Sequence, residues 1–258
     1  MNNDNWNPDF ITKSPLFETI RTVVEAYIPC SSWPTLAQHE AEFKQRGLAF
    51  TPVPQADKPG QLADHYEPRI YLKKEIQTRT ENWHDFFNAM IWLSFPATKS
   101  RLNERHYHAA IKREYGTNRS PLENAITLFD ECGIIVISNN TKLLDMIRQH
   151  EWTKLFCENR QAFENELQCL VFGHAMYEKA LTPYIGMTCQ ALLIEHETLP
   201  NNNQAIDKLV ADLWQQEKIK TTKDLHPFPV LGVPGWYDGD QDEGFYDNKE
   251  YFRPLKNK

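Results

Sequence analysis

The segment from Asn82 to Pro96 places the strongest constraint on how this 258-residue chain folds. Its apolar residues surround nearly the whole circumference of the expected helix, and a helix of this kind is buried in a core. The first turns nevertheless carry His84, Asp85 and Asn88. Buried polar side chains reduce stability unless other side chains, water, a metal ion or a ligand satisfy them. The segment therefore narrows where a site can lie, without identifying an activity.

The composition is that of a globular protein, with 41% hydrophobic and 24% charged residues. The formal net charge of −7 argues against a general nucleic-acid-binding protein. Five scattered cysteines without a CxxC pair favour a reducing compartment over a disulfide framework or a cysteine zinc site. The longest apolar run is about half a membrane span. We therefore expect a soluble, cytoplasmic protein with no membrane partner.

The predicted fold class is mixed α/β (α+β), predominantly helical, with a small sheet. The β-branched run at residues 134–137 predicts a strand buried on both faces, and residues 191–194 predict a second buried strand. Weak alternation at residues 69–76 indicates an edge strand. A long helix is expected over residues 163–181, with His174 on its apolar stripe. The other expected helices cover residues 15–28, 34–47, 82–96, 97–115, 121–131 and 206–214.

We expect a single domain over residues 1–258. Residues 1–15 are polar, lack the regions of a signal peptide and are predicted to form an N-terminal extension. Residues 225–258 combine proline, glycine and acidic residues with too many aromatic residues for a disordered segment. This C-terminal segment is predicted to pack on the domain as an extended, irregular strap.

Two pairs of polar residues have helical spacing. His84 and Asn88 are four residues apart, as are His174 and Glu178, so each pair shares one face of its expected helix. If the two helices pack together, these residues and Asp85 could form a nitrogen and oxygen site for a divalent metal such as zinc, iron or manganese. A histidine base oriented by a carboxylate is an alternative arrangement. A buried hydrogen-bond network, or binding of a small-molecule ligand without chemistry, explains the same pattern.

Asp130 and Glu131 are secondary candidates, because they immediately precede the strand at residues 134–137. They could join the histidines as metal ligands. A solvated helix end, or a cap for a neighbouring helix, is the simpler interpretation and is favoured over a ligand role.

Residues 99–119 form the most basic part of the chain. They could bind a phosphate or an acidic partner. A solvated helix face, covered by the acidic tail, is the simpler interpretation. The basic residues are Lys99, Arg101, Arg105, Lys112, Arg113 and Arg119.

The motifs GxGxxG, GxxxxGK[ST] and GxSxG are absent, which disfavours common nucleotide enzymes and serine hydrolases.

Four sequence blocks occur in a fixed order along the chain. They are Asn82-Trp83-His84-Asp85 with Phe95-Pro96, residues 128–133 (Leu-Phe-Asp-Glu-Cys-Gly), residues 172–175 (Phe-Gly-His-Ala) with Glu178-Lys179, and residues 229–236 (Pro-Val-Leu-Gly-Val-Pro-Gly-Trp). Together they resemble the signatures of a proteobacterial domain-of-unknown-function family, over roughly residues 66–254. The resemblance implies a bacterial origin and one family domain, and no activity, cofactor or fold. It also implies that the polar residues named above belong to the pattern of the family.

Two functional hypotheses follow. The first is a cytoplasmic metal-assisted hydrolase, in which His84, Asp85, His174 and Glu178 serve as ligands or acid–base groups and Asn88 orients the substrate. The second is a non-enzymatic binding or adaptor protein that uses the basic segment or the aromatic tail, with the histidines and acids as a structural network. Neither the substrate nor the metal is assigned by the sequence.

Overall fold

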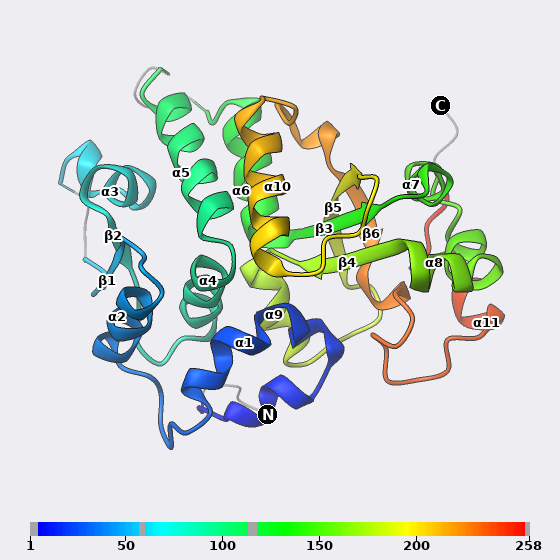
Figure 1. Ribbon diagram of the computed structural model, residues 1–258, viewed down its shortest axis with the longest axis horizontal. Helices are drawn as coiled ribbons and strands as arrows, with labels where there is room; N and C mark the ends of the chain where they lie inside the picture. Colours follow the sequence, from blue (N-terminus) through cyan, green and yellow to red (C-terminus); the bar gives the residue numbers. More distant parts are fainter. Residues whose placement is uncertain (1–4, 57–59, 113–117, 256–258) are drawn as a thin grey trace.

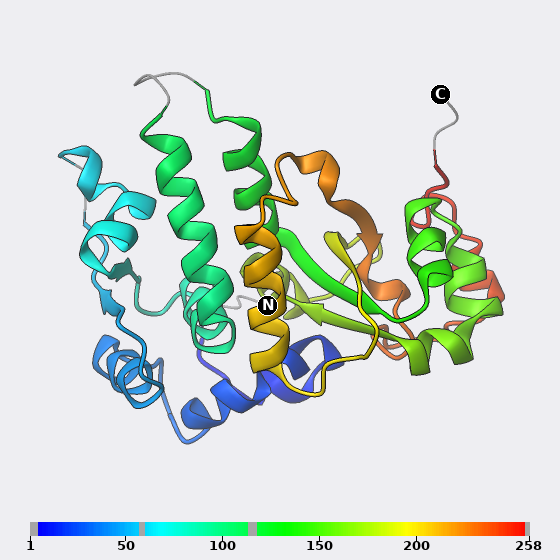
Figure 2. The same cartoon turned by 45° about the horizontal axis from the view of Figure 1, so that its top comes forward.

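The structure is a computed structural model that describes residues 5–56, 60–112 and 118–255. Helices dominate and two small sheets accompany them, which confirms the mixed, mainly helical class. A group of helices stands between a two-stranded sheet on one side and a four-stranded sheet on the other (Figures 1 and 2). These central helices are α4 (Trp83–Ser94), α5 (Pro96–Ala110), α6 (Pro121–Cys132) and α10 (Asn203–Gln215).

The four-stranded sheet has the order β4-β3-β5-β6. Its central strands run parallel, while the two outer strands are antiparallel to their neighbours. Every residue of β3 is buried, as the β-branched run predicts, and both expected buried strands are confirmed. The strands are β3 (Gly133–Ser138), β4 (Leu167–Val171), β5 (Thr188–Glu195) and β6 (His226–Pro229).

The smaller sheet pairs β1 (Thr51–Val53) with β2 (Glu75–Gln77) in parallel. The edge strand expected over residues 69–76 is wrong for most of its length, because helix α3 (Tyr66–Lys73) occupies it. This helix buries Pro68 and Ile70 and packs against α5, so tertiary contact decides a segment whose local pattern is ambiguous. Helix α2 (Leu36–Gln45) packs beside β1.

The long helix expected over residues 163–181 is also wrong. The chain forms α8 (Arg160–Glu166), then β4, then α9 (His174–Ala180). The intervening residues pair with the buried strand β3, from Leu167 opposite Ser138 to Val171 opposite Ile134. Hydrogen bonding to this strand outweighs the helical pattern of the apolar residues. His174 therefore begins a helix and does not lie within a longer one.

Local signals place the ends of the helices that carry the candidate residues. The Asn82 side chain accepts a hydrogen bond from the backbone of Asp85 and caps α4, of whose twelve residues nine are buried. Ser120 and Glu123 form the capping box at the start of α6. Pro96 ends α4 and occupies the first turn of α5.

The N-terminal segment differs from the expected polar extension. Phe10 and Ile11 are buried, and the ring of Trp6 stacks on Trp83 with a centroid distance of 5.4 Å. Residues 1–4 lie outside the described part of the chain. Apolar side chains placed at intervals between the polar ones anchor this segment to α4. Its short helices are η1 (Pro8–Thr12), η2 (Pro15–Ile20), α1 (Arg21–Val24) and η3 (Glu25–Tyr27).

The C-terminal segment is more regular than an irregular strap, since it contributes β6 to the large sheet and adds two short helices, η7 (Val230–Gly232) and α11 (Glu243–Tyr246). The Tyr251 hydroxyl donates to the Met187 carbonyl at 2.7 Å and accepts from the Leu231 amide at 2.9 Å. The segment lies on the side of the molecule away from α5, so it does not cover the basic helix (Figure 1).

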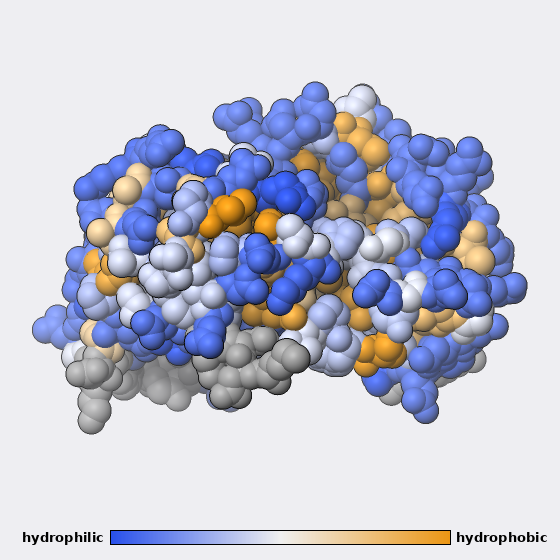
Figure 3. Space-filling model, turned by 90° about the horizontal axis from the view of Figure 1, so that it is seen from below, coloured by the Kyte–Doolittle hydropathy of each residue, from blue (hydrophilic) through white to orange (hydrophobic). Residues whose placement is uncertain are grey.

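A cluster of buried apolar side chains includes residues from Phe10 to Phe252. The face shown in Figure 3 is largely hydrophilic, with apolar side chains in separate groups. Within the described residues, no helix is long and apolar enough to cross a membrane. Helix α7 (Thr141–Arg148) packs against β3, β5 and β6, and the short π-helical turn η5 (Lys154–Glu158) packs against α7 and α8. The short 3-10 helices η4 (Leu62–Asp64) and η6 (Thr222–Asp224) lie beside α3 and α6, respectively.

Candidate functional site

Three helix ends bring the candidate residues together. His84 lies in the first turn of α4, Glu131 in the last turn of α6, and His174 is the first residue of α9. Helix α9 packs against both α4 and α6. A Cβ at Gly173 would lie 2.4 Å from the Gly133 backbone nitrogen, so this glycine lets α9 begin against the α6–β3 junction.

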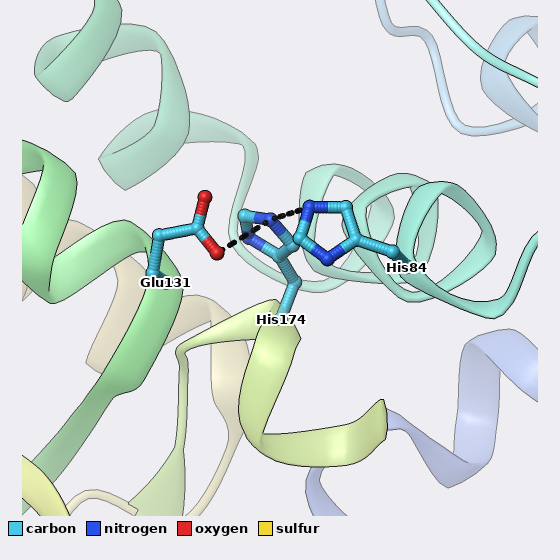
Figure 4. A group of neighbouring side chains, drawn as sticks. All are labelled: His84, Glu131 and His174. Carbon is cyan, nitrogen blue, oxygen red and sulfur yellow. Dashed lines mark hydrogen bonds and ion pairs between the residues drawn. The ribbon is translucent and has the colours of Figure 1, made fainter. Parts of the chain in front are cut away.

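The side chains of these three residues point toward one another (Figure 4). The two Nε2 atoms of His84 and His174 are 3.0 Å apart, and the ring planes are inclined by 78°. The Glu131 Oε2 atom lies 3.5 Å from His174 Nε2. One ligand atom from each residue falls within 4.8 Å of the others. His174 is buried, while His84 and Glu131 are partly exposed.

Each imidazole also faces a carboxylate with its other nitrogen. His84 Nδ1 is 3.2 Å from Glu178 Oε2, and His174 Nδ1 is 3.6 Å from Asp130 Oδ2. His174 Nδ1 is buried without a hydrogen-bond partner among the described residues. In metal sites the second nitrogen of a ligating histidine is usually held by a carboxylate, a carbonyl or water. The arrangement leaves both Nε2 atoms for a shared ligand.

A buried network continues behind His174. The Lys99 ammonium lies 2.5 Å from Asp130 Oδ1 and donates to Asn88 Oδ1 at 2.9 Å. Asn88 in turn donates to the Tyr66 hydroxyl at 2.6 Å. Both ends of the Asn88 amide are thus used within the protein, which makes it a member of the network.

Burial and charge set the protonation of these groups. Burial lowers the pKa of His174 to about 3, against the opposing charge of Asp130, so its imidazole is neutral near pH 7. Burial raises the pKa of Asp130, but Lys99 and the histidines outweigh that effect and leave it below its ordinary value. Burial raises the pKa of Glu131, with the charge of His84 opposing. A neutral imidazole is the form that binds a metal or accepts a proton.

Two of the four primary metal-ligand candidates, Asp85 and Glu178, lie outside the cluster of three. Asp85 forms a bidentate pair with Arg79, with distances of 2.8 Å and 2.9 Å, and also accepts from the Arg79 backbone at 2.7 Å. Both of its oxygens are therefore occupied. Glu178 contacts the outer nitrogen of His84. The nearest carboxylate to the paired Nε2 atoms belongs to Glu131, a secondary candidate from sequence.

A cavity of about 370 Å³ opens beside the cluster. His84, Glu131 and His174 line one part of it, and Tyr66, Glu67 and His106 line another. Ile126 is the one aliphatic residue of the lining within the described chain. A larger cavity of about 690 Å³ lies between the N-terminal helices and β4, and its described lining contains no histidine. The smaller cavity combines space with titratable groups and is the better candidate site.

The distances from His174 Nε2 to the other two ligand atoms suit a small cation. Zinc–nitrogen and zinc–oxygen bonds of about 2 Å in a tetrahedral site place ligand atoms about 3.3 Å apart. The distances of 3.0 Å and 3.5 Å lie on either side of that value. Two histidines and one carboxylate leave a coordination position open for water, as in catalytic zinc sites, and the same set suits iron.

The basic segment is not a wholly solvated helix face. The Lys99 side chain is only 5% exposed, because it faces Asp130. Arg105 donates to the carbonyls of Trp214 and Ile219 at 2.7 Å and 3.1 Å. Arg101 pairs with Glu104, and Lys112 and Arg119 are exposed. Arg113 lies outside the described residues.

Comparisons with known proteins give one match. A family model described as "Protein of unknown function (DUF3025)" matches residues 49–256, a range that contains every residue of the cluster and its flanking acids. No curated protein and no solved structure matches the chain.

Proposed function

We propose that this protein, which belongs to the DUF3025 family of proteins of unknown function, is a metal-dependent hydrolase. Its divalent ion would be held by His84, Glu131 and His174. One observation carries the proposal: ligand atoms of these three residues converge within 4.8 Å. The Glu178 carboxylate supports it, because its contact of 3.2 Å with the outer nitrogen of His84 fixes the imidazole orientation that a ligand needs. Asp130 faces the outer nitrogen of His174 at 3.6 Å.

An ion bound there supplies a polarising charge and an activated water at the open coordination position. The chain supplies the rest. Burial keeps His174 neutral, and the Asp130 carboxylate beside its ring is held by Lys99. The polar and titratable side chains that line the adjacent cavity suit a small substrate with polar groups.

A structural network is the competing explanation. The 3.0 Å contact between His84 and His174 is a satisfactory hydrogen bond if one ring donates to the other. The chain from Tyr66 through Asn88 to Lys99 links α3, α4 and α5 without any ion. Under this alternative the residues hold helices in register, and the protein acts by binding a ligand or partner.

Metal analysis separates the two explanations. The untagged protein is purified without chelators, loaded with Zn²⁺, Mn²⁺ or Fe²⁺, passed over a desalting column and analysed by mass spectrometry of the elements. His174→Ala is compared with His39→Ala, a matched control. His39 is as buried as His174, its pKa is also lowered by burial, to about 4, and it is bound to Tyr27 at 3.0 Å.

We expect close to one ion per chain in the wild type and in His39→Ala, and none in His174→Ala. Both variants should lose stability, by about 1–3 kcal/mol for an orphaned buried partner. If no protein holds an ion and both variants are merely less stable, the network explanation is correct. The loaded protein is then assayed on ester, amide and phosphoester substrates. If an ion is bound and none of these substrates is hydrolysed, the proposal of a hydrolase is refuted, but the proposal of a metal site stands.

We also propose a cytoplasmic location and a single domain. All five cysteines are free, which suits a reducing compartment. The continuous set of buried apolar side chains from Phe10 to Phe252 supports one domain. Fractionation of cells that express the tagged protein tests the location, and a single cooperative unfolding transition tests the domain.

A further inference from the structure

We propose that the cavity wall formed by α3 and α5 is a subsite for a protonated amine, with the Glu67 carboxylate as its counter-charge and with Tyr66 and His106 as flanking hydrogen-bonding groups. This inference rests on the proposed function only in treating the cavity as a substrate site. It names the class of substrate: a small hydrophilic molecule that carries an ammonium group.

Glu67 is the carboxylate of this cavity that lacks a close cation. It lies in the first turn of α3, and its Oε2 accepts a hydrogen bond of 2.6 Å from the Asn103 amide on α5. Within the described residues, no lysine, arginine or histidine nitrogen lies within the 4.0 Å of an ion pair. A neutral amide is a donor, but it leaves the negative charge uncompensated.

The other acids of the cavity already have partners. Asp85 is neutralised by Arg79, and Asp130 by Lys99. Glu131 faces the paired histidines and would be neutralised by a divalent ion. The remaining negative charge therefore lies at Glu67, and a ligand cation is the group that complements it.

Two other side chains that line the cavity, Tyr66 and His106, have hydrogen-bonding capacity that the described residues leave unused. The His106 side chain is buried, at 7% exposure, and its Nδ1 has no hydrogen-bond partner among the described residues. The Tyr66 oxygen accepts from Asn88, while its own hydrogen has no acceptor in the described part of the chain. Buried polar atoms are rarely left unpaired, so these groups indicate a missing partner in the cavity.

The electrostatic environment agrees with this assignment. Burial raises the pKa of Glu67, and the charge of Asp130 raises it further, against the opposing charges of His106 and Lys99. A bound ammonium would stabilise the ionised carboxylate. The cavity lining also contains Arg119, which donates to the Thr127 hydroxyl at 3.3 Å, so an anionic ligand would find a cation there, whereas Glu67 selects an ammonium group.

Two probes of nearly equal shape test the proposal. Ethanolamine and ethylene glycol differ in one group, ammonium against hydroxyl, so the difference in their affinity isolates the charge. Binding is followed by nuclear magnetic resonance titration of the full chain, as purified and after metal removal. The variants are Glu67→Gln, which keeps the shape and removes the charge, and Glu104→Gln, a control on α5 that removes one acid near Arg101.

We expect ethanolamine to bind about tenfold more tightly than ethylene glycol, as for one charge-assisted hydrogen bond. The preference should persist in Glu104→Gln, persist without metal, and vanish in Glu67→Gln. Coordination of the amine to a bound ion would instead survive in Glu67→Gln and disappear on metal removal. Equal binding of the probes, or a preference that does not depend on Glu67, overturns the subsite. The metal content of the purified protein tests the proposed function independently of this amine subsite.

Should Glu67→Gln fail to fold, the wild-type chain still decides. The carboxyl carbon of ¹³C-labelled Glu67 should shift with ethanolamine and not with ethylene glycol. Absence of that shift while ethanolamine binds elsewhere overturns the proposal.

Discussion

Replacing Lys99 by methionine should be among the most damaging single changes in the chain. The substitution nearly preserves the length of the side chain and removes only its charge and its donors. In the native protein the ammonium binds Asp130 at 2.5 Å and Asn88 at 2.9 Å, and lies 5.2 Å from the centre of the Trp92 ring. All of these contacts are lost together, while the apolar stem can remain in place.

The magnitude follows from burial. The Lys99 and Asp130 side chains are 5% and 17% exposed, so removal of the cation leaves a largely buried carboxylate without its partner. Breaking one side of a buried ion pair costs about 3–5 kcal/mol. The folded-state pKa of Asp130 lies below its ordinary value, so this stabilisation is present above the unfolded-state pKa of about 4 and is lost as pH falls through the folded-state pKa.

Urea unfolding at pH 7 measures the free energy of unfolding of Lys99→Met against Arg148→Met. The control breaks an exposed pair with Asp145, in which the side chains are 36% and 60% exposed, and should cost no more than about 1 kcal/mol. The double variant Lys99→Met with Asp130→Leu should recover part of the loss, because the orphaned charge is gone. If Lys99→Met costs no more than the control, the reasoning from burial is refuted.

Three other predictions concern single positions. Gly173→Ala should lower the free energy of unfolding by about 1–3 kcal/mol, because the added Cβ would meet the backbone at the α6–β3 junction. The same change should abolish metal uptake, since it displaces His174, and unchanged uptake would contradict this prediction. Burial lowers the pKa of His39 to about 4, so its neutral form stabilises the fold above pH 6.5, and stability falls as pH drops from 6.5 to 4, by on the order of 3 kcal/mol. His39→Gln should show a correspondingly flatter pH profile of unfolding. Tyr251→Phe should cost about 1–3 kcal/mol by thermal unfolding, since the Met187 carbonyl and Leu231 amide lose their partner, and an unchanged midpoint would contradict this.

The helices expected over residues 82–96 and 121–131 lie close to their observed bounds, because their ends depend on local chemistry. The cap at Asn82, the capping box from Ser120 to Glu123 and the break at Pro96 all fall where their side chains and backbone require. The run at residues 134–137 predicted a strand buried on both faces, because β-branched residues without alternation suit few other environments.

The errors arise where tertiary contacts decide. Residues 167–171 have the spacing of a helix stripe, yet they pair with β3, and no local feature announces that partner. Residues 66–73 form a helix that packs on α5, although the charged alternation at residues 69–76 suggests a strand. In both segments the local preference is weak and the neighbouring element selects the conformation.

The candidate site shows the same division. Helical spacing and polarity selected His84 and His174, and the fold brings them to 3.0 Å. The sequence ranked Asp85 above Glu131, whereas in the structure Asp85 is held by Arg79 six residues earlier and Glu131 approaches His174 from another helix. Which carboxylate lies nearest to a histidine depends on the packing of three helices, and sequence spacing within one helix does not contain that information.

The contact between the two Nε2 atoms has a consequence for how an ion would enter. Two imidazole nitrogens 3.0 Å apart repel through their lone pairs unless one proton lies between them. A metal ion that binds both atoms must therefore displace that proton, and the Nδ1 atom of His174, which faces Asp130 and has no hydrogen-bond partner among the described residues, can receive it. Calorimetric titrations in buffers of different ionisation enthalpy would then give equal apparent heats, whereas a slope in those heats would count protons lost to solvent.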